Sequence, residues 1–177
     1  IGFKKIELED KDLITHYFKH HTSRSCERTF VNVYLWARFY HVKFAEVEHT
    51  LVFRTEDEDG FSFAYPAGEP ENVKKALDVL MVYSKERGVP FLMYTVTPDN
   101  FEYLEKWYPG RFEIEYVEGD ADYVYESEKL ATLSGKKLHS KRNHINKFKI
   151  VYADRWSYEP ISEDNLEECV QTGLKWR

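Results

Sequence analysis

The stretch Phe91-Leu92-Met93-Tyr94-Thr95-Val96 decides the fold of this chain. It is a short, continuous apolar run, a pattern typical of a β-strand that is buried on both faces. An amphipathic helical pattern over residues 73–83 precedes it and ends at Gly88 and Pro90, which are common helix-stop residues. Because another extended segment comes before that helix, the order strand, helix, strand predicts a crossover connection between parallel strands.

The rest of the chain divides into segments with helical and with extended patterns. Two helical patterns and three short extended segments come before the crossover. Antiparallel strands followed by parallel crossovers predict an α/β fold, in which a mixed sheet is flanked by helices on both faces. We expect helices over residues 9–18, 30–40, 73–83, 97–107, 136–149 and 162–174, and strands over residues 42–47, 50–54, 61–65, 91–96, 112–117, 123–125 and 150–152.

A basic segment follows the predicted sheet: Leu133-Ser134-Gly135-Lys136-Lys137-Leu138-His139-Ser140-Lys141-Arg142-Asn143-His144-Ile145-Asn146-Lys147-Phe148-Lys149. Residues 129–153 contain seven Lys or Arg and no Asp or Glu, whereas the rest of the chain has 18 Lys or Arg against 31 carboxylates. Residues 112–128 show the reverse, with seven carboxylates and no Lys or Arg. Such segregation indicates either a site for an anionic partner or two neighbouring elements that neutralise each other.

Composition narrows the functional classes. The 177 residues have room for one domain of ordinary size and part of a second. A net charge of −6 argues against a general nucleic-acid coating protein, so an anion site must be local. Cys26 and Cys169 have no ligand-like spacing and favour free thiols in a reducing compartment.

The sequence shows no membrane or targeting segment. No apolar run approaches the roughly 18 residues that a spanning helix needs, and no signal-peptide pattern opens the chain. We therefore expect a cytoplasmic protein. The chain starts at Ile1 without Met, and residues 175–177 continue a helical pattern without a stop signal, so we expect it to be part of a longer protein.

One cation of the basic segment has an unusual position. On a helical wheel, Leu138, Ile145 and Phe148 form an apolar sector that contains Lys141, with Arg142 at its edge. A buried, unpaired charge is costly. The ammonium of Lys141 therefore extends into solvent, pairs with an acid of the preceding strands such as Asp122 or Glu126, or faces a cleft that holds an anion.

The start of the basic helix strengthens the last of these alternatives. Ser134-Gly135 predicts that the helix begins at or just before Lys136, where free backbone N–H groups favour anions. His139 and His144 are five residues apart and point to different sides, which argues against a joint metal site. The predicted anion or phosphate site comprises Lys136, Lys137, Lys141, Arg142 and Asn143.

A second candidate for phosphate binding is Tyr65-Pro66-Ala67-Gly68, which leads from a strand into a helix. Loops at this position often hold phosphates, but a glycine-rich fingerprint is absent here. The carboxylates of Glu69 and Glu71 would also repel a pyrophosphate. We therefore interpret this segment as a tight turn.

Several motifs of the sequence are shared with a known family. The most specific are Ala121-Asp122-Tyr123-Val124-Tyr125, Leu130-Ala131-x-Leu133-Ser134-Gly135-Lys136-Lys137 and Lys141-Arg142-Asn143-x-Ile145-x-Lys147-Phe148. With them, the chain resembles uncharacterised bacterial proteins related to the C-terminal domain of phosphatidylglycerol lysyltransferase. The likeness covers nearly the whole chain and includes Glu9-Asp10-Lys11 and Thr29-Phe30-Val31-Asn32-Val33-Tyr34-Leu35-Trp36.

The resemblance implies two tandem acyltransferase-like domains of the GNAT type, the fold of acyl-CoA N-acyltransferases. Residues 1–149 would form the first GNAT-like domain, and residues 150–177 would begin a second, truncated one. The better-known relatives transfer an aminoacyl group from charged tRNA to a lipid or to peptidoglycan. This sequence departs from them because it has no flippase-like membrane region.

Two functions are compatible with these features. The first is a GNAT-like aminoacyl- or acyltransferase that transfers an (amino)acyl group from aminoacyl-tRNA or acyl-CoA to a lipid, peptide or small-molecule acceptor. The second is a non-catalytic anion-binding module that docks tRNA or an anionic phospholipid headgroup through the basic helix. The sequence assigns no catalytic residue, metal ligand or resident cofactor, and it leaves the oligomeric state open.

Overall fold

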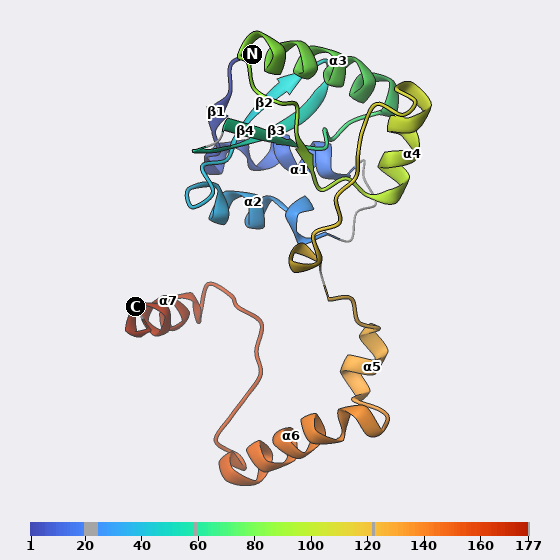
Figure 1. Cartoon of the computed structure of the whole chain (residues 1–177). Coiled ribbons are helices and arrows are strands. Elements are labelled where there is room, and N and C mark those ends of the chain that lie inside the picture. Colours follow the sequence, from blue (N-terminus) through green and yellow to red (C-terminus); the bar gives the residue numbers. More distant parts are fainter. Residues whose placement is uncertain (20–24, 59, 122, 177) are drawn as a thin grey trace. The chain divides into compact units, whose positions relative to one another are not determined.

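A computed structural model of the chain describes residues 1–19, 25–58, 60–121 and 123–176 (Figure 1). These residues form two compact units, Ile1–Asp122 and Tyr123–Arg177, which we call unit 1 and unit 2. The domain boundary that the sequence predicts after Lys149 falls within a helix of unit 2. For the whole protein, that boundary stays a prediction.

Unit 1 contains the sheet and the helices that cover it. Its elements are β1 (Lys4–Lys5), η1 (Leu8–Asp10), α1 (Lys11–Lys19), η2 (Cys26–Arg28), α2 (Phe30–Ala37), β2 (Lys43–Val47), β3 (Thr50–Asp57), β4 (Gly60–Ala64), α3 (Pro70–Glu86), β5 (Met93–Tyr94), α4 (Pro98–Trp107) and η3 (Glu118–Asp120), where η denotes a 3-10 helix.

The described strands form a mixed sheet in the order β1-β2-β3-β4-β5. The first three pairings are antiparallel, and β4 pairs with β5 in parallel. Helix α3 connects these two parallel strands, as a parallel pairing requires. The predicted mixed α/β sheet flanked by helices is thus confirmed.

Side chains along β3 and β4 alternate between the two faces of the sheet. Leu51 and Phe53 pack on one face with α1 and α2, whereas Val52 packs on the other face with α3. In β4, Phe63 packs on the face covered by α3, and Ala64 packs on the face covered by α1 and α2. Because successive residues of a strand point to opposite faces, a sheet covered on both sides needs apolar residues at consecutive positions.

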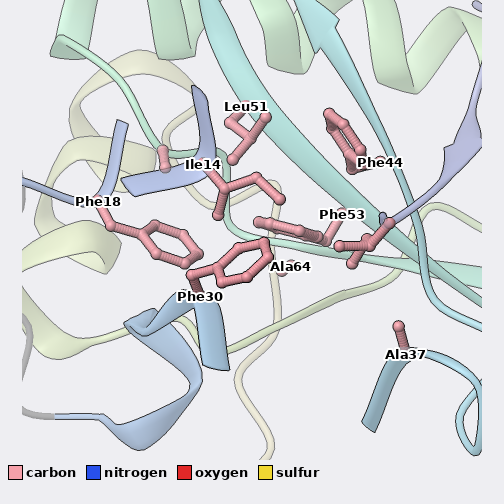
Figure 2. Close-up of a cluster of buried hydrophobic side chains, with 10 residues drawn as sticks. Ile14, Phe18, Phe30, Ala37, Phe44, Leu51, Phe53 and Ala64 are labelled. Atoms are coloured by element: carbon pink, nitrogen blue, oxygen red, sulfur yellow. The ribbon is translucent and has the colours of Figure 1, made fainter. Parts of the chain in front are cut away.

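The face under α1 and α2 has a tightly buried cluster (Figure 2). Ile14 of α1 and Phe30 of α2 lie against Phe53, and Phe18 is 5.7 Å from the Phe53 ring, centroid to centroid. Phe44 of β2 completes the contact at 6.2 Å from the same ring. Helices α1 and α2 therefore depend on one central aromatic side chain of the sheet.

Local signals in the sequence explain where the helices begin. Thr29 Oγ1 accepts a hydrogen bond from Asn32 N at the start of α2. At the start of α4, Thr97 and Asn100 form a capping box in which each side chain bonds the other residue's backbone N–H. Pro70 occupies the first turn of α3, where its missing N–H is not needed.

Four strand predictions differ from the structure. Residues 91–96 form only the two-residue β5, which lies at the edge of the described sheet and is half-buried rather than covered on both faces. Residues 112–117 and 123–125 have no strand pairing in the described structure. The strand predicted over residues 150–152 is wrong, because these residues form the last turn of a helix. A strand needs a partner to supply its hydrogen bonds, and a local pattern cannot provide one.

The segment after β4 is not the tight turn that the sequence predicts. Ala67 forms an antiparallel bridge with Leu51, with N···O distances of 2.8 and 2.9 Å. This bridge brings Gly68 against Thr50, so that a Cβ atom at position 68 would lie 2.7 Å from Thr50 Cγ2. The segment thus extends the contact with β3 before α3 begins.

Gly68→Ala should destabilise unit 1 by about 1–3 kcal/mol, because Thr50 is fully buried and cannot move aside. Chemical denaturation followed by near-UV circular dichroism measures the free energy of unfolding. Gly2→Ala is the matched control, since a Cβ atom there meets nothing within 4 Å. Equal stabilities of the two variants would contradict this packing argument.

A charged pair links the first strand to the first helical turn. Asp10 is buried, and its carboxylate accepts hydrogen bonds from Lys4 Nζ at 2.6 Å and from Glu7 N at 3.0 Å. Burial raises the pKa of Asp10, but the Lys4 and Glu7 hydrogen bonds outweigh it, so this pKa lies below its ordinary value.

The ionised form of Asp10 therefore stabilises the fold above about pH 4, the ordinary range of an Asp pKa, and this stabilisation is lost as pH falls through the folded-state pKa. Asp10→Asn should lower the free energy of unfolding at pH 7, and its difference from the unmodified chain should shrink toward pH 3. Lys4→Met should act in the same direction and less strongly, because the Glu7 N–H bond remains. Denaturation curves between pH 3 and 7 test this, and a pH-independent difference for Asp10→Asn would refute it.

Unit 2 consists of helices in its described part. They are α5 (Ser127–Thr132), η4 (Lys136–Leu138), α6 (His139–Tyr152) and α7 (Leu166–Lys175). None of the described residues 123–176 is buried. The predicted basic helix is confirmed, although it starts as the 3-10 turn η4 and continues to Tyr152.

Candidate functional site

Two places in the chain could bind a ligand: the basic segment of unit 2 and a cavity in unit 1. In the basic segment, Leu133 ends α5 in a left-handed conformation with φ 50°, and Gly135 has φ 92°. These two residues reverse the chain between α5 and η4. The turn places Lys136 and Lys137 on η4 and Lys141 on the first turn of α6.

Arg142 stabilises this turn. Its Nη1 donates hydrogen bonds to the carbonyl oxygen of Leu133 and, at 3.0 Å, to that of Gly135. A guanidinium has several N–H donors in a fixed geometry, so it can hold two neighbouring carbonyls at once. Arg142 therefore organises the loop, a role that no local pattern in the sequence predicts.

The lysines of the predicted anion site have a different environment. Lys136, Lys137 and Lys141 are exposed, and none of them forms an ion pair with a described carboxylate. The proposed pairing of Lys141 with Glu126 is not present, and Asp122 lies outside the described residues. Three uncompensated cations along one short segment are an attractive surface for phosphate.

The remaining polar residues of the segment do not form a metal site. Asn143 Nδ2 lies 3.4 Å from His139 Nδ1, one helical turn away. Within the described part of the chain, no group of three His, Cys, Asp or Glu is arranged to hold a metal ion. His16 and His20 are four residues apart in the sequence, a spacing that metal ligands use, and we interpret them as surface histidines; His20 lies outside the described residues.

Unit 1 contains a cavity of about 520 Å³ between α2 and the sheet. Its floor comes from three adjacent strands: Phe53 and Thr55 of β3, Ser62 and Ala64 of β4, and Tyr94 of β5. The register pairs Thr55 with Ser62 and Ala64 with Tyr94, and residues two apart in a strand share a face. The sheet thus builds a continuous surface from chain segments far apart in sequence.

The opposite wall of the cavity is one face of α2 and the turn after it. Asn32, Trp36 and Tyr40 recur at four-residue spacing and line the cavity together with Val33. The Trp36 and Tyr40 ring centroids are 5.8 Å apart. An aromatic wall therefore faces a floor that carries hydroxyl groups.

Arg28 of η2 adds a cation to the cavity lining. Its Nη2 donates to Tyr65 O at 2.8 Å, and its guanidinium lies 5.8 Å from the centre of the Phe18 ring. Burial lowers the pKa of Arg28, although charges nearby, chiefly that of Glu27, act in the opposite direction. The group remains a cation, because the ordinary pKa of arginine is far above neutrality.

Two residues at the end of β5 complete the lining. Tyr94 Oη and Thr55 Oγ1 share a hydrogen bond of 2.8 Å, and burial raises the pKa of Tyr94 despite this bond. Thr95 has φ 54°, a conformation rare for a β-branched residue, and its buried Oγ1 has no hydrogen-bond partner among the described residues. Backbone strain of this kind often accompanies a ligand site.

A sequence profile of the family described as "Phosphatidylglycerol lysyltransferase, C-terminal" matches residues 18–177. The chain belongs to this family. Both candidate sites of this member of the phosphatidylglycerol lysyltransferase C-terminal family lie within the matched residues. The resemblance stated from its motifs is thereby confirmed.

Two similar proteins have no assigned function. A solved structure of a conserved protein of unknown function from Bacteroides thetaiotaomicron is similar with a TM-score of 0.84 and 34% identity, over 99% of this chain and 59% of that chain. An uncharacterized protein of Mycoplasmoides gallisepticum is 32% identical over 72 residues, which are 40% of this chain and 23% of that protein. The matched residues thus span about three fifths of the first relative's length and about one quarter of the second's.

Two further features bear on the setting of the sites. No helix within the described residues has the length and apolar character needed to cross a membrane. Cys26 and Cys169 are both exposed, and Cys169 is a free thiol, as the sequence predicts.

Arg142→Ala should loosen the turn between α5 and α6, because each lost hydrogen bond contributes about 0.5–1.5 kcal/mol. We expect amide hydrogen exchange of residues 133–138 to accelerate roughly five- to tenfold. Lys141→Ala is the control, since its exposed ammonium supports no such bond. Unchanged exchange in Arg142→Ala, or equal acceleration in both variants, would contradict this assignment.

Proposed function

We propose that the protein takes part in acyl transfer, as a GNAT-like aminoacyl- or acyltransferase that acts on a phosphate-bearing donor or acceptor. This proposal rests on two observations together: the family to which the chain belongs and a cationic surface that suits phosphate. The family's name refers to transfer of lysine to phosphatidylglycerol, a phosphate-bearing lipid, and three exposed lysines of the chain have no carboxylate partner in its described part.

The fold is compatible with the GNAT type. That fold is expected to have a mixed sheet flanked by helices, and the parallel pairing of β4 with β5 across α3 agrees with this expectation. Acyl transfer needs an amine or hydroxyl held against a carbonyl, and groups that stabilise the developing negative charge. It does not need a Ser-His-Asp triad, so no catalytic residue is assigned here.

In this proposal, Lys136, Lys137 and Lys141 hold the phosphates, and Arg142 keeps the turn that precedes them in shape. A lysine ammonium acts as a point charge with three donors, which suits phosphates whose geometry varies. Asn143 adds an exposed amide one residue further along α6. Aminoacyl-tRNA is the proposed donor, with acyl-CoA as the alternative.

The activity test uses the full-length protein with charged tRNAs that carry radiolabelled amino acids, and with lipid and peptide acceptors. Label should move to an acceptor, and the Lys136→Gln, Lys137→Gln, Lys141→Gln triple variant should lose most of this transfer. The control replaces three exposed lysines of unit 1, Lys11, Lys75 and Lys85, by Gln. Transfer that is absent with every charged tRNA would overturn the proposed reaction.

Salt dependence separates an enzyme from a non-catalytic module that docks tRNA or an anionic phospholipid surface. If the three lysines contact phosphates, log K for tRNA should fall by roughly 0.7–0.9 per contact with log salt concentration, and the triple variant should flatten this slope by about 2–3. Salt-dependent binding without transfer would favour the binding module. An equal slope in the triple variant would exclude these lysines as the phosphate contacts.

A further inference from the structure

We propose that the cavity of unit 1 binds a small carboxylate that carries a flat aromatic group, with Arg28 as the partner of the carboxylate. The cavity belongs to unit 1 and the basic segment to unit 2, and this inference does not depend on the acyl-transfer proposal. Its volume of about 520 Å³ lies within the range of sites for small organic molecules.

Arg28 is the strongest indication of an acidic ligand. It is half-buried, yet in the described structure its partners are the Tyr65 carbonyl and the Phe18 ring, and no carboxylate lies within ion-pair distance. Residues 20–24, His-His-Thr-Ser-Arg, also contain no carboxylate. A guanidinium with unused N–H donors in a partly dehydrated place favours a bidentate anion such as a carboxylate.

Glu27 also lines the cavity, and its charge would oppose an acidic ligand. However, Glu27 is exposed, so water and salt screen its carboxylate, whereas Arg28 is partly shielded from both. The less screened cation, Arg28, therefore determines the sign of the ligand's charge. A purely cationic ligand would be repelled by the positive charge of Arg28.

Flat aromatic groups fit the rest of the cavity. Trp36 is 49% exposed and stands with Tyr40 on one side, and Phe53 forms part of the floor. Large exposed aromatic side chains at the entrance of a cavity are costly to leave in water and are well suited to stacking. The Thr55 and Tyr94 hydroxyls give the floor a polar point for ligand orientation.

Thr95 gives independent support. A left-handed conformation at a β-branched residue costs stability, and burial of a hydroxyl without a partner costs more. Thr95 lines the cavity, so rotation of its side chain toward a ligand oxygen there would give the hydroxyl the hydrogen bond that it lacks among the described residues. The structure thus keeps at this position a residue that serves the fold poorly and a ligand well.

The test uses three probes that share one indole ring: indole-3-propionate, its neutral amide indole-3-propionamide, and tryptamine, which is a cation. Isothermal titration calorimetry should give the tightest binding for the propionate, by about tenfold over the amide, with still weaker binding of tryptamine. Among the four tryptophan side-chain N–H signals in an NMR spectrum, that of Trp36 should shift most. Equal affinity for the three probes, or preference for tryptamine, would overturn the proposal.

Matched variants locate the site. Trp36→Ala should weaken indole-3-propionate binding about tenfold. Phe39→Ala should leave this binding unchanged, because Phe39 does not line the cavity. Phe39 is a matched control, since its ring centroid lies 6.0 Å from that of Trp36 in the same exposed aromatic group. Likewise, Arg28→Gln should abolish the preference for propionate over amide, and Arg38→Gln, an exposed arginine outside the cavity lining, should preserve it.

Thr95→Gly keeps the proposal testable if Arg28→Gln fails to fold. Glycine adopts positive φ without strain, so the melting temperature should be unchanged or raised. Binding of indole-3-propionate should weaken several-fold because the hydroxyl is lost. Undiminished binding by both Thr95→Gly and Trp36→Ala would refute the site.

Discussion

The alternation of side chains along β3 and β4 is the constraint on which unit 1 depends. Both faces of these strands are covered by helices, so each residue must suit the face to which it points. Phe53 and Phe63 lie on opposite faces and each anchors an aromatic group. A shift of register by one residue would exchange the two faces and leave Thr55 and Ser62 under α3. The same alternation that builds the core therefore builds the cavity floor.

Buried Arg54 and half-buried Arg28 have different partners in the fold. Arg54 is 8% exposed, and it donates to Tyr83 Oη at 2.7 Å and pairs with Glu56 at 3.2 Å. Its guanidinium also lies 4.6 Å from the centre of the Phe3 ring. Arg54 is thus compensated by a carboxylate and by aromatic faces, as a structural cation should be. Arg28 has a backbone carbonyl and one ring but no such carboxylate in the described structure, which is why it points to a ligand.

Local signals in the sequence predict the helices of this chain, whereas features that need a partner from another segment do not show in the sequence. The helical patterns over residues 30–40, 73–83 and 97–107 depend only on neighbouring residues, and a helix is present at each of them. Residues 112–117 alternate as a strand does, but alternation does not supply a neighbouring edge, and the described structure gives them none. The basic lysines could be found in the sequence because they lie within one short segment. The hydrogen bonds of Arg142 could not be predicted from the sequence. They accompany a positive φ at Leu133, and leucine is not a residue type that favours this conformation.

The two candidate sites would recognise negative charge by different physics. The lysines of the basic segment are exposed, so their attraction acts through water over roughly a Debye length, about 8 Å at physiological salt, and fades as salt is added. Arg28 lies in a shaped cavity, where fewer water molecules screen it and where aromatic walls add contacts that salt does not weaken. The first arrangement suits a flexible, highly charged phosphate chain, and the second suits a small acid of defined shape. A sequence can display the first as a run of charges, whereas the second arises only when the sheet register places residues from four distant segments around one space.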